Sequence, residues 1–144
     1  MKSFKKNLFL GLALGSVLFA GCNKDDDNSE PGPGTGGNTT YKVKFVGTVS
    51  PGSSITTASI VYGVNTTGFT SLSGTSWTKE MDLTETDLRA FSENPTKNIS
   101  FGIQASGSDE NATAKSEIFV NGTSVKSAEG HGTILSPNAT YIFN

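Results

Sequence analysis

The single cysteine of this 144-residue chain is Cys22, and a thiol is a side chain that can be modified covalently. Three lysines come first, then a short apolar stretch that ends at Phe19, and the small residues Ala20 and Gly21 directly precede the cysteine. A membrane-spanning helix needs about 20 apolar residues, and this stretch is much shorter. A basic segment, a short apolar segment and a small-residue site are the parts of a secretory signal peptide. The sequence therefore predicts export.

Because Cys22 follows the small pair directly, the segment resembles a bacterial lipoprotein signal of the type II class. That class usually has Leu three residues before the cysteine, where this chain has Phe19. The resemblance implies that residues 1–21 are removed and that fatty acyl chains such as palmitate modify Cys22. One acyl chain holds a protein to a membrane only marginally, whereas two or three hold it firmly. We therefore expect a lipid-anchored protein.

Residues 22–40 show no hydrophobic periodicity. An acidic run from Asp25 to Glu30 is followed by a Gly/Pro-rich run from Pro31 to Gly37. Such a composition cannot bury enough apolar area to fold, so we predict a flexible tether. A flexible coil of this length reaches about 23 Å, enough to hold a small domain clear of the lipid headgroups.

Lys24, Asp25 and Asp26 follow the modified cysteine closely. They resemble the lysine-then-acidic export signal of surface lipoproteins in Bacteroidota-type bacteria. The resemblance implies an outer-membrane protein exposed on the cell surface. A solvated tether that is acidic by composition alone is the other interpretation.

Charge excludes two classes of partner. Removing the three signal-peptide lysines leaves eight basic residues against thirteen acidic ones, a formal charge of −5. A weakly acidic chain without clustered Lys or Arg is not expected to bind nucleic acid or anionic headgroups. Lys42 and Lys44 are predicted to lie on the solvent face of a strand.

From residue 41 to residue 144, apolar and polar residues alternate in short segments separated by Gly, Asn, Ser and Thr. The alternating sets are Tyr41, Val43 and Phe45; Ala58, Ile60, Tyr62 and Val64; Trp77, Met81 and Leu83; Ile99, Phe101, Ile103 and Ala105; Ile118 and Val120; and Tyr141 and Phe143. A turn is expected at Asn65–Gly68, and Asn121–Gly122 predicts a type I′ hairpin. The pattern predicts an all-β domain, an antiparallel β-sandwich of about seven to eight strands, with a barrel as the alternative.

One segment interrupts this pattern. Thr84 and Asp87 have the spacing of a helix-capping pair, in which side chains bond the first free amides. We predict one or two helical turns that end before Asn94–Pro95. Leu88 and Phe91 are expected to cover one end of the sandwich.

The order of features resembles the extracytoplasmic β-sandwich of the MmpS-type small membrane proteins. The matching segments are Ile60–Tyr62, Ser76–Thr78, Ile118–Gly122 and Val125–Ser127. Ser76 stands where the family has a proline, and Ser116 where it has a cysteine, so the family's disulfide is absent. The resemblance implies the same fold and a role in assisting an envelope transporter.

No residue set predicts catalysis. His131, the only histidine, lies between glycines and lacks partner ligands for a metal. A Gly-x-Ser-x-Gly turn is missing, and the acidic pairs Glu85 with Asp87 and Asp109 with Glu110 are expected in a helix start and a loop. We predict no enzyme activity, no cofactor and no metal site. Trp77 is predicted to anchor the core, with stacking on a sugar ring as the alternative.

Three segments, Gly63–Gly68, Ser106–Asn111 and Ser127–Gly132, are predicted as loops that make contacts. Their Ser, Thr, Asn and Gly content suits hydrogen bonding to glycans or proteins. We therefore expect a lipid-anchored, surface-exposed, non-enzymatic binding module whose ligand is a glycan or a protein. The alternative is a periplasm-facing accessory subunit of an envelope transport complex.

Overall fold

The computed structural model describes residues 39–89 and 96–144. Cys22, Lys24, Asp25, Asp26 and Phe91 lie outside the described residues, so the predictions on lipidation, export and the tether stay predictions. The elements are β1 (Thr40–Val49), β2 (Ser54–Tyr62), β3 (Asn65–Phe69), β4 (Ser76–Thr84), α1 (Glu85–Leu88), β5 (Lys97–Ser106), β6 (Thr113–Val120), β7 (Thr123–His131), β8 (Ile134–Leu135) and β9 (Asn138–Phe143).

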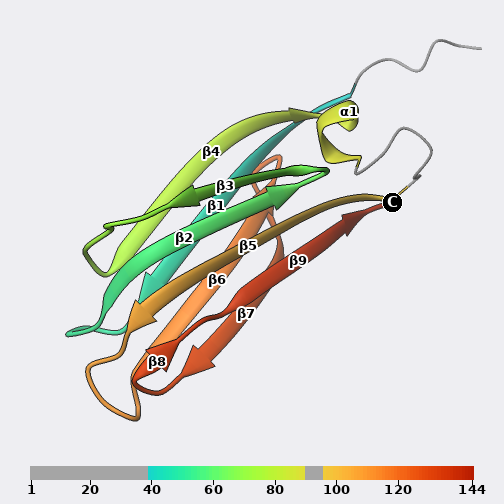
Figure 1. The fold of residues 1–144 in the computed structure, drawn as a ribbon. Coiled ribbons are helices and arrows are strands. Elements are labelled where there is room, and N and C mark those ends of the chain that lie inside the picture. Colours follow the sequence, from blue (N-terminus) through green and yellow to red (C-terminus); the bar gives the residue numbers. More distant parts are fainter. Residues whose placement is uncertain (1–38, 90–95) are drawn as a thin grey trace, which may run out of the picture. The chain divides into compact units, whose positions relative to one another are not determined.

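The strands form two antiparallel sheets, which confirms the all-β sandwich. One sheet has the order β4–β1–β6–β7. The other has the order β3–β2–β5, and β5 then pairs with β8 near its end and with β9 along the rest of its length. Figure 1 shows the two sheets as separate layers. We refer to them as the four-stranded and the five-stranded sheet.

The core lies between the two sheets and is built from the alternating positions. Phe45, Ile60, Phe101 and Ile118 have no exposed surface. Successive residues of a strand point to opposite faces, so one half of each strand faces this core. Trp77 is half-buried and stacks on Phe101 with ring centroids 5.5 Å apart and an interplanar angle of 18°. The prediction that Trp77 anchors the core is confirmed.

Two local predictions are confirmed. Asn121 (φ 50°) and Gly122 (φ 84°) form the two-residue turn between β6 and β7, because both tolerate the left-handed region. Thr84 caps α1: its hydroxyl accepts from the Asp87 amide, and the Asp87 carboxylate accepts from the Thr84 amide at 2.8 Å. The helix ends at Leu88, which is fully buried.

Two predictions near the second strand are wrong. Asn65–Gly68 is part of β3, not a turn, and the chain reverses at Gly63 and Val64 instead. Val64 therefore lies outside the core and is 66% exposed. The Thr-rich sequence of β3 suits an edge strand, and only its pairing with β2 distinguishes it from a turn.

The four-stranded sheet ends at β4 and β7, and each of these edge strands has a lysine on its core-facing side. Lys79 is paired with Phe45 and Lys126 with Ile118, and residues directly opposite share a face. Both partners are fully buried, whereas both lysines are exposed at the sheet edge. An inward-pointing charge on an edge strand opposes pairing with a further strand.

Candidate functional site

The two sheets differ in charge. The strands of the four-stranded sheet carry nine Lys, Asp and Glu residues. Among the described strands of the five-stranded sheet, Lys97 alone carries such a charge. Lys97 is paired with buried Phe143 and bonds Glu85, so it does not belong to the outer face. The outer face of the five-stranded sheet is therefore uncharged.

A row of directly opposed residues crosses this outer face. Gly68 on β3 lies opposite Ser59 on β2, which lies opposite Gly102 on β5, which lies opposite Asn138 on β9. The two glycines have no side chain and the serine has a small one, so these three positions project little from the surface of the sheet. Larger side chains form the rows on either side, with Thr57 opposite Gln104 on one side and Val61 opposite Ser100 on the other. The register thus creates a groove that runs across the strands.

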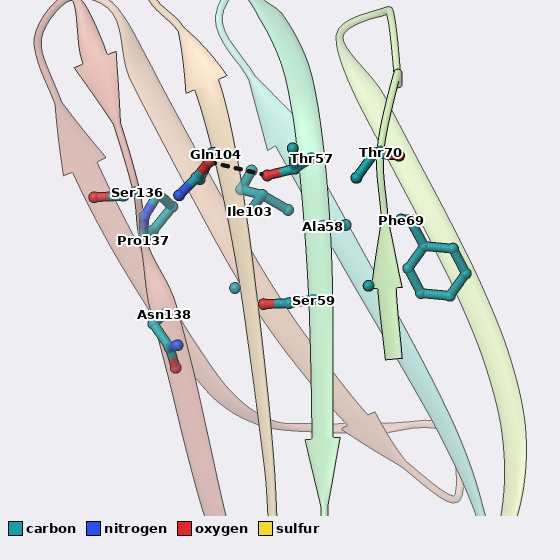
Figure 2. A pocket seen from close by; sticks show the side chains of 12 residues that line it. Thr57, Ala58, Ser59, Phe69, Thr70, Ile103, Gln104, Ser136, Pro137 and Asn138 are labelled. Atoms are coloured by element: carbon teal, nitrogen blue, oxygen red, sulfur yellow. Dashed lines mark hydrogen bonds between the residues drawn. The ribbon is translucent and has the colours of Figure 1, made fainter. Parts of the chain in front are cut away.

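Figure 2 shows the lining of this groove. A cavity of about 300 Å³ lies over Gly68, Ser59 and Gly102. It extends to Gln104, Ser136 and Pro137. A second cavity of about 380 Å³ continues from Gln104 and Ser136 toward Ile134. Since the two cavities share Gln104 and Ser136, we treat them as one feature, the cross-strand groove. Ligand pockets start at about this size.

Two carboxamide side chains in the groove are oriented by hydrogen bonds. The oxygen of Gln104 accepts from the Thr57 hydroxyl at 3.2 Å, and Figure 2 shows its nitrogen turned toward Pro137. The oxygen of Asn138 accepts from the Ser100 hydroxyl at 2.7 Å. Ser100 in turn lies 2.9 Å from the Thr140 hydroxyl. Each amide oxygen is thus engaged, and neither NH₂ group donates to another of the described residues, so both keep their donors for a ligand.

Four large apolar side chains of the described residues are exposed. All belong to the strands of the five-stranded sheet or to the turn between β2 and β3: Val61, Val64, Ile134 and Ile142. Ile134 is 87% exposed at one end of the cross-strand groove. The uncharged face thus offers hydroxyl, amide and aliphatic groups together. Single exposed apolar residues are common on proteins, but their restriction to one sheet distinguishes this face.

A second groove, of about 590 Å³, lies on the outer face of the four-stranded sheet. Its lining includes Lys42, Lys44, Glu80, Asp82 and half-buried Phe119. Lys44 and Glu80 form an ion pair at 3.7 Å with both side chains well exposed. Such pairs are screened by water and contribute little. Lys42 and Lys44 lie on the solvent face as predicted.

The predicted acidic pairs have structural roles. Glu85 accepts a hydrogen bond from Lys97 at 3.1 Å and another from Tyr41, and its pKa is lowered chiefly by Lys97. The pKa of Asp87 is lowered by its hydrogen bonds from Thr84. In both groups these contacts favour the charged carboxylate at the start of α1. Asp109 accepts a hydrogen bond from the Asn111 amide at 2.7 Å and shapes a turn.

Of the three predicted contact loops, one is a loop. Ser106–Asn111 begins at the last residue of β5 and otherwise belongs to the loop, residues 107–112, that connects β5 to β6. Gly63–Gly68 belongs mostly to β3, and Ser127–Gly132 mostly to β7, so both of those predictions are wrong. His131 is the last residue of β7, paired with Thr113, rather than a turn residue. Gly130 and Gly132 resemble loop residues in the sequence, but the ladder to β6 continues through this segment.

The alternation of residue types in the sequence does not predict the cross-strand groove. Its signal is present in the chain, since the outward positions 57, 59, 100, 102, 104, 138 and 140 are all uncharged, whereas 42, 44, 80 and 82 are all charged. Periodicity alone does not tell which residues lie opposite one another, and the row of Gly68, Ser59 and Gly102 depends on that register.

Within residues 39–89 and 96–144, no group of three or more His, Cys, Asp or Glu side chains is placed to hold a metal ion. No helix in these ranges has the length and hydropathy that a membrane crossing requires. Comparisons of the chain with models of protein families, with curated proteins and with solved structures found no match.

Proposed function

We propose that this chain is a lipid-anchored, non-enzymatic binding module on the surface of the bacterial outer membrane, and that it binds through the outer face of its five-stranded sheet. The anchor rests on Cys22 and the segment before it. Surface display rests on Lys24, Asp25 and Asp26. The contact face rests on the structure.

The observation that supports the contact face most is the separation of charge between the sheets. A surface that meets only water normally mixes charges of both signs, as the four-stranded sheet does. Charged residues are depleted in the centres of binding surfaces. The outer face of the five-stranded sheet has this composition and also carries the exposed aliphatic residues Val61 and Ile142.

Protease treatment of intact cells tests surface display. A tag after Asn144 is followed by immunoblot, with lysed cells as control. We expect the tag to be lost from intact cells. Protection in intact cells with loss after lysis would place the domain in the periplasm and refute the display proposal. Replacing Lys24, Asp25 and Asp26 with Ala is expected to turn the first pattern into the second.

Acyl labelling tests the anchor. We expect radiolabelled palmitate to be incorporated into the wild-type chain and to be absent from Cys22→Ser. Ser116→Cys combined with Cys22→Ser is the matched control, because it restores one thiol at a buried position. Labelling that persists in Cys22→Ser would refute the lipoprotein interpretation.

A periplasm-facing accessory subunit of an envelope transport complex is the second proposal. The MmpS-type resemblance supports it, since Ile118–Gly122, one of the matching segments, forms the end of β6 and its hairpin turn. Mild cross-linking of intact cells followed by purification under denaturing conditions tests it. A transporter recovered with the wild-type chain would favour this role over surface display.

A further inference from the structure

We propose that the cross-strand groove binds a neutral oligosaccharide. This inference deepens the proposed function, because it names the ligand class of the module, and it rests on that function for its biological setting. Three properties of the groove favour such a ligand: its lack of charge, its oriented amide groups and its apolar surfaces.

The lack of charge selects a neutral ligand. Neither cavity of the groove is lined by a Lys, Arg, Asp or Glu residue. A sulfated, phosphorylated or uronic acid ligand loses hydration when it enters a groove and needs a basic partner to offset that cost. Basic side chains instead line the groove on the other sheet, where Lys42 and Lys44 lie. The cross-strand groove therefore favours uncharged hydroxyl groups over acidic ones.

The position of the groove disfavours an extended peptide. A peptide that adds to a sheet bonds the free main-chain groups of an edge strand. The cross-strand groove instead runs across the strands rather than along an edge, and its middle is formed by β2 and β5, which are paired with strands on both sides. Their main-chain groups are already engaged in the ladders. Binding here must use side-chain hydroxyl and amide groups, which match the hydroxyls of a sugar.

Gln104 and Asn138 supply the oriented donors. Thr57 and Ser100 hold their carbonyl oxygens, so the NH₂ groups have fixed directions and can donate to sugar hydroxyl oxygens. The nitrogen of Asn138 lies close over Gly102, 3.1 Å from where a Cβ would stand. A side chain that is already held in place loses less entropy when a ligand binds.

The apolar surfaces suit the C–H faces of a sugar ring. Gly68 leaves its end of the groove floor open, Gly102 lets the Asn138 amide lie close to the sheet, and Pro137 and Ile134 present aliphatic surface beside the amides. An oligosaccharide also combines polar hydroxyl edges with apolar C–H faces. Because the groove crosses β3, β2, β5 and the β8–β9 segment, the ligand would lie across the strands.

Titration of the full chain, purified in detergent, tests the proposal. The probes are the neutral polysaccharides β-glucan, mannan, xylan and galactan, with polygalacturonate and heparin as acidic comparators. Two variants alter the groove. Gly68→Thr raises the floor, and we expect the fold to be retained because no atom lies within 4 Å of the added Cβ. Gln104→Ala removes an oriented donor. Thr78→Val, on the exposed face of β4, is the matched control.

We expect at least one neutral polysaccharide to bind, both groove variants to weaken binding at least tenfold, and the control to stay within twofold of wild type. Circular dichroism confirms that each variant is folded. The proposal is overturned if no neutral probe binds, if acidic probes bind better, or if Gly68→Thr and Gln104→Ala bind as wild type does. Binding by a chain that proves to be periplasmic would refute surface display alone, and a displayed chain that does not bind would refute this inference alone.

Discussion

The hydroxyl of Ser116 donates a hydrogen bond of 2.9 Å to the carbonyl oxygen of Pro137. Ser116 lies on β6 of the four-stranded sheet and is fully buried, and Pro137 lies between β8 and β9 of the five-stranded sheet. The bond therefore joins the two layers. The same carbonyl oxygen also accepts from the Ile103 amide at 3.2 Å, so Pro137 is held between both sheets beside the cross-strand groove.

We expect Ser116→Ala to lower the free energy of unfolding by about 1 kcal/mol, the net value of a typical hydrogen bond. The cost stays near this value because the Pro137 carbonyl keeps its bond from Ile103. Urea unfolding followed by the fluorescence of the sole tryptophan measures it. Ser127→Ala, at an exposed position of β7, is the control. Equal midpoints for Ser116→Ala and wild type would contradict the role of this bond.

Two glycines provide a matched pair. Gly63 has φ +55°, and a Cβ there would meet the backbone oxygens of Asp87 and Arg89, the latter at 2.6 Å. Gly68 has ordinary backbone angles and open space around it. We expect Gly63→Ala to destabilise the domain by about 1–3 kcal/mol. Gly68→Ala should be neutral or stabilising by up to about 1 kcal/mol. Thermal unfolding ranks the two, and the reverse order would refute the close approach of the β2–β3 turn to α1.

Stability is expected to fall in acid. The pKa values of Glu85, Asp87 and Glu117 are lowered in the folded state, by Lys97, Thr84 and Ser124 respectively as the main causes. A lowered pKa means that the folded state favours the charged form. The stability gained is therefore present above the ordinary values of 4.5 for Glu and 3.8 for Asp and is lost as pH falls through the lowered values.

Urea unfolding at pH 7, 5, 4 and 3 measures this dependence. Glu85→Gln removes one of the three carboxylates, so its stability should decline less between pH 5 and pH 3 than that of wild type. Glu80→Gln, at an exposed position that forms an ion pair with Lys44, is the matched control. A Glu85→Gln curve parallel to that of wild type would show that the Lys97 contact does not contribute.

The edge lysines are expected to keep the domain from associating through its strands. We predict that Lys79→Val combined with Lys126→Val promotes oligomers, because it removes the inward charge from both edges of the four-stranded sheet. Light scattering during size-exclusion chromatography measures the mass. Lys42→Val combined with Lys44→Val removes equal charge from β1, an inner strand, and should stay closer to the wild-type mass. A monomeric edge variant would refute this role.

Much of the fold follows from local sequence. Alternation assigns Ile99, Phe101 and Ile103 to the core, and Asn121–Gly122 and Thr84 with Asp87 have short-range signals with known geometry. The wrong predictions concern segments that form strands only because a neighbouring strand pairs with them. The β3 segment lacks apolar alternation, and the end of β7 is rich in Gly, so each forms a strand because a neighbouring strand bonds it.

The candidate site was less predictable than the fold. Alternation places Ser59, Gly102 and Asn138 on outward positions but does not place them side by side. Their row depends on the alignment of four strands, and on a bulge near Thr57 that shifts the register between β2 and β5. Reactive side chains such as that of His131 are easy to recognise in a sequence, whereas the groove is built from residues with small or uncharged side chains.

The cross-strand groove is assembled from segments around residues 58, 68, 103 and 137, which are distant in the chain. The groove exists only in the folded state, so a ligand that occupies it must raise the melting temperature of the whole domain. By mass action, a ligand at 100 times its dissociation constant adds about 2.7 kcal/mol to the folded state. A thermal shift screen of the intact chain can therefore search for the ligand with no knowledge of its identity.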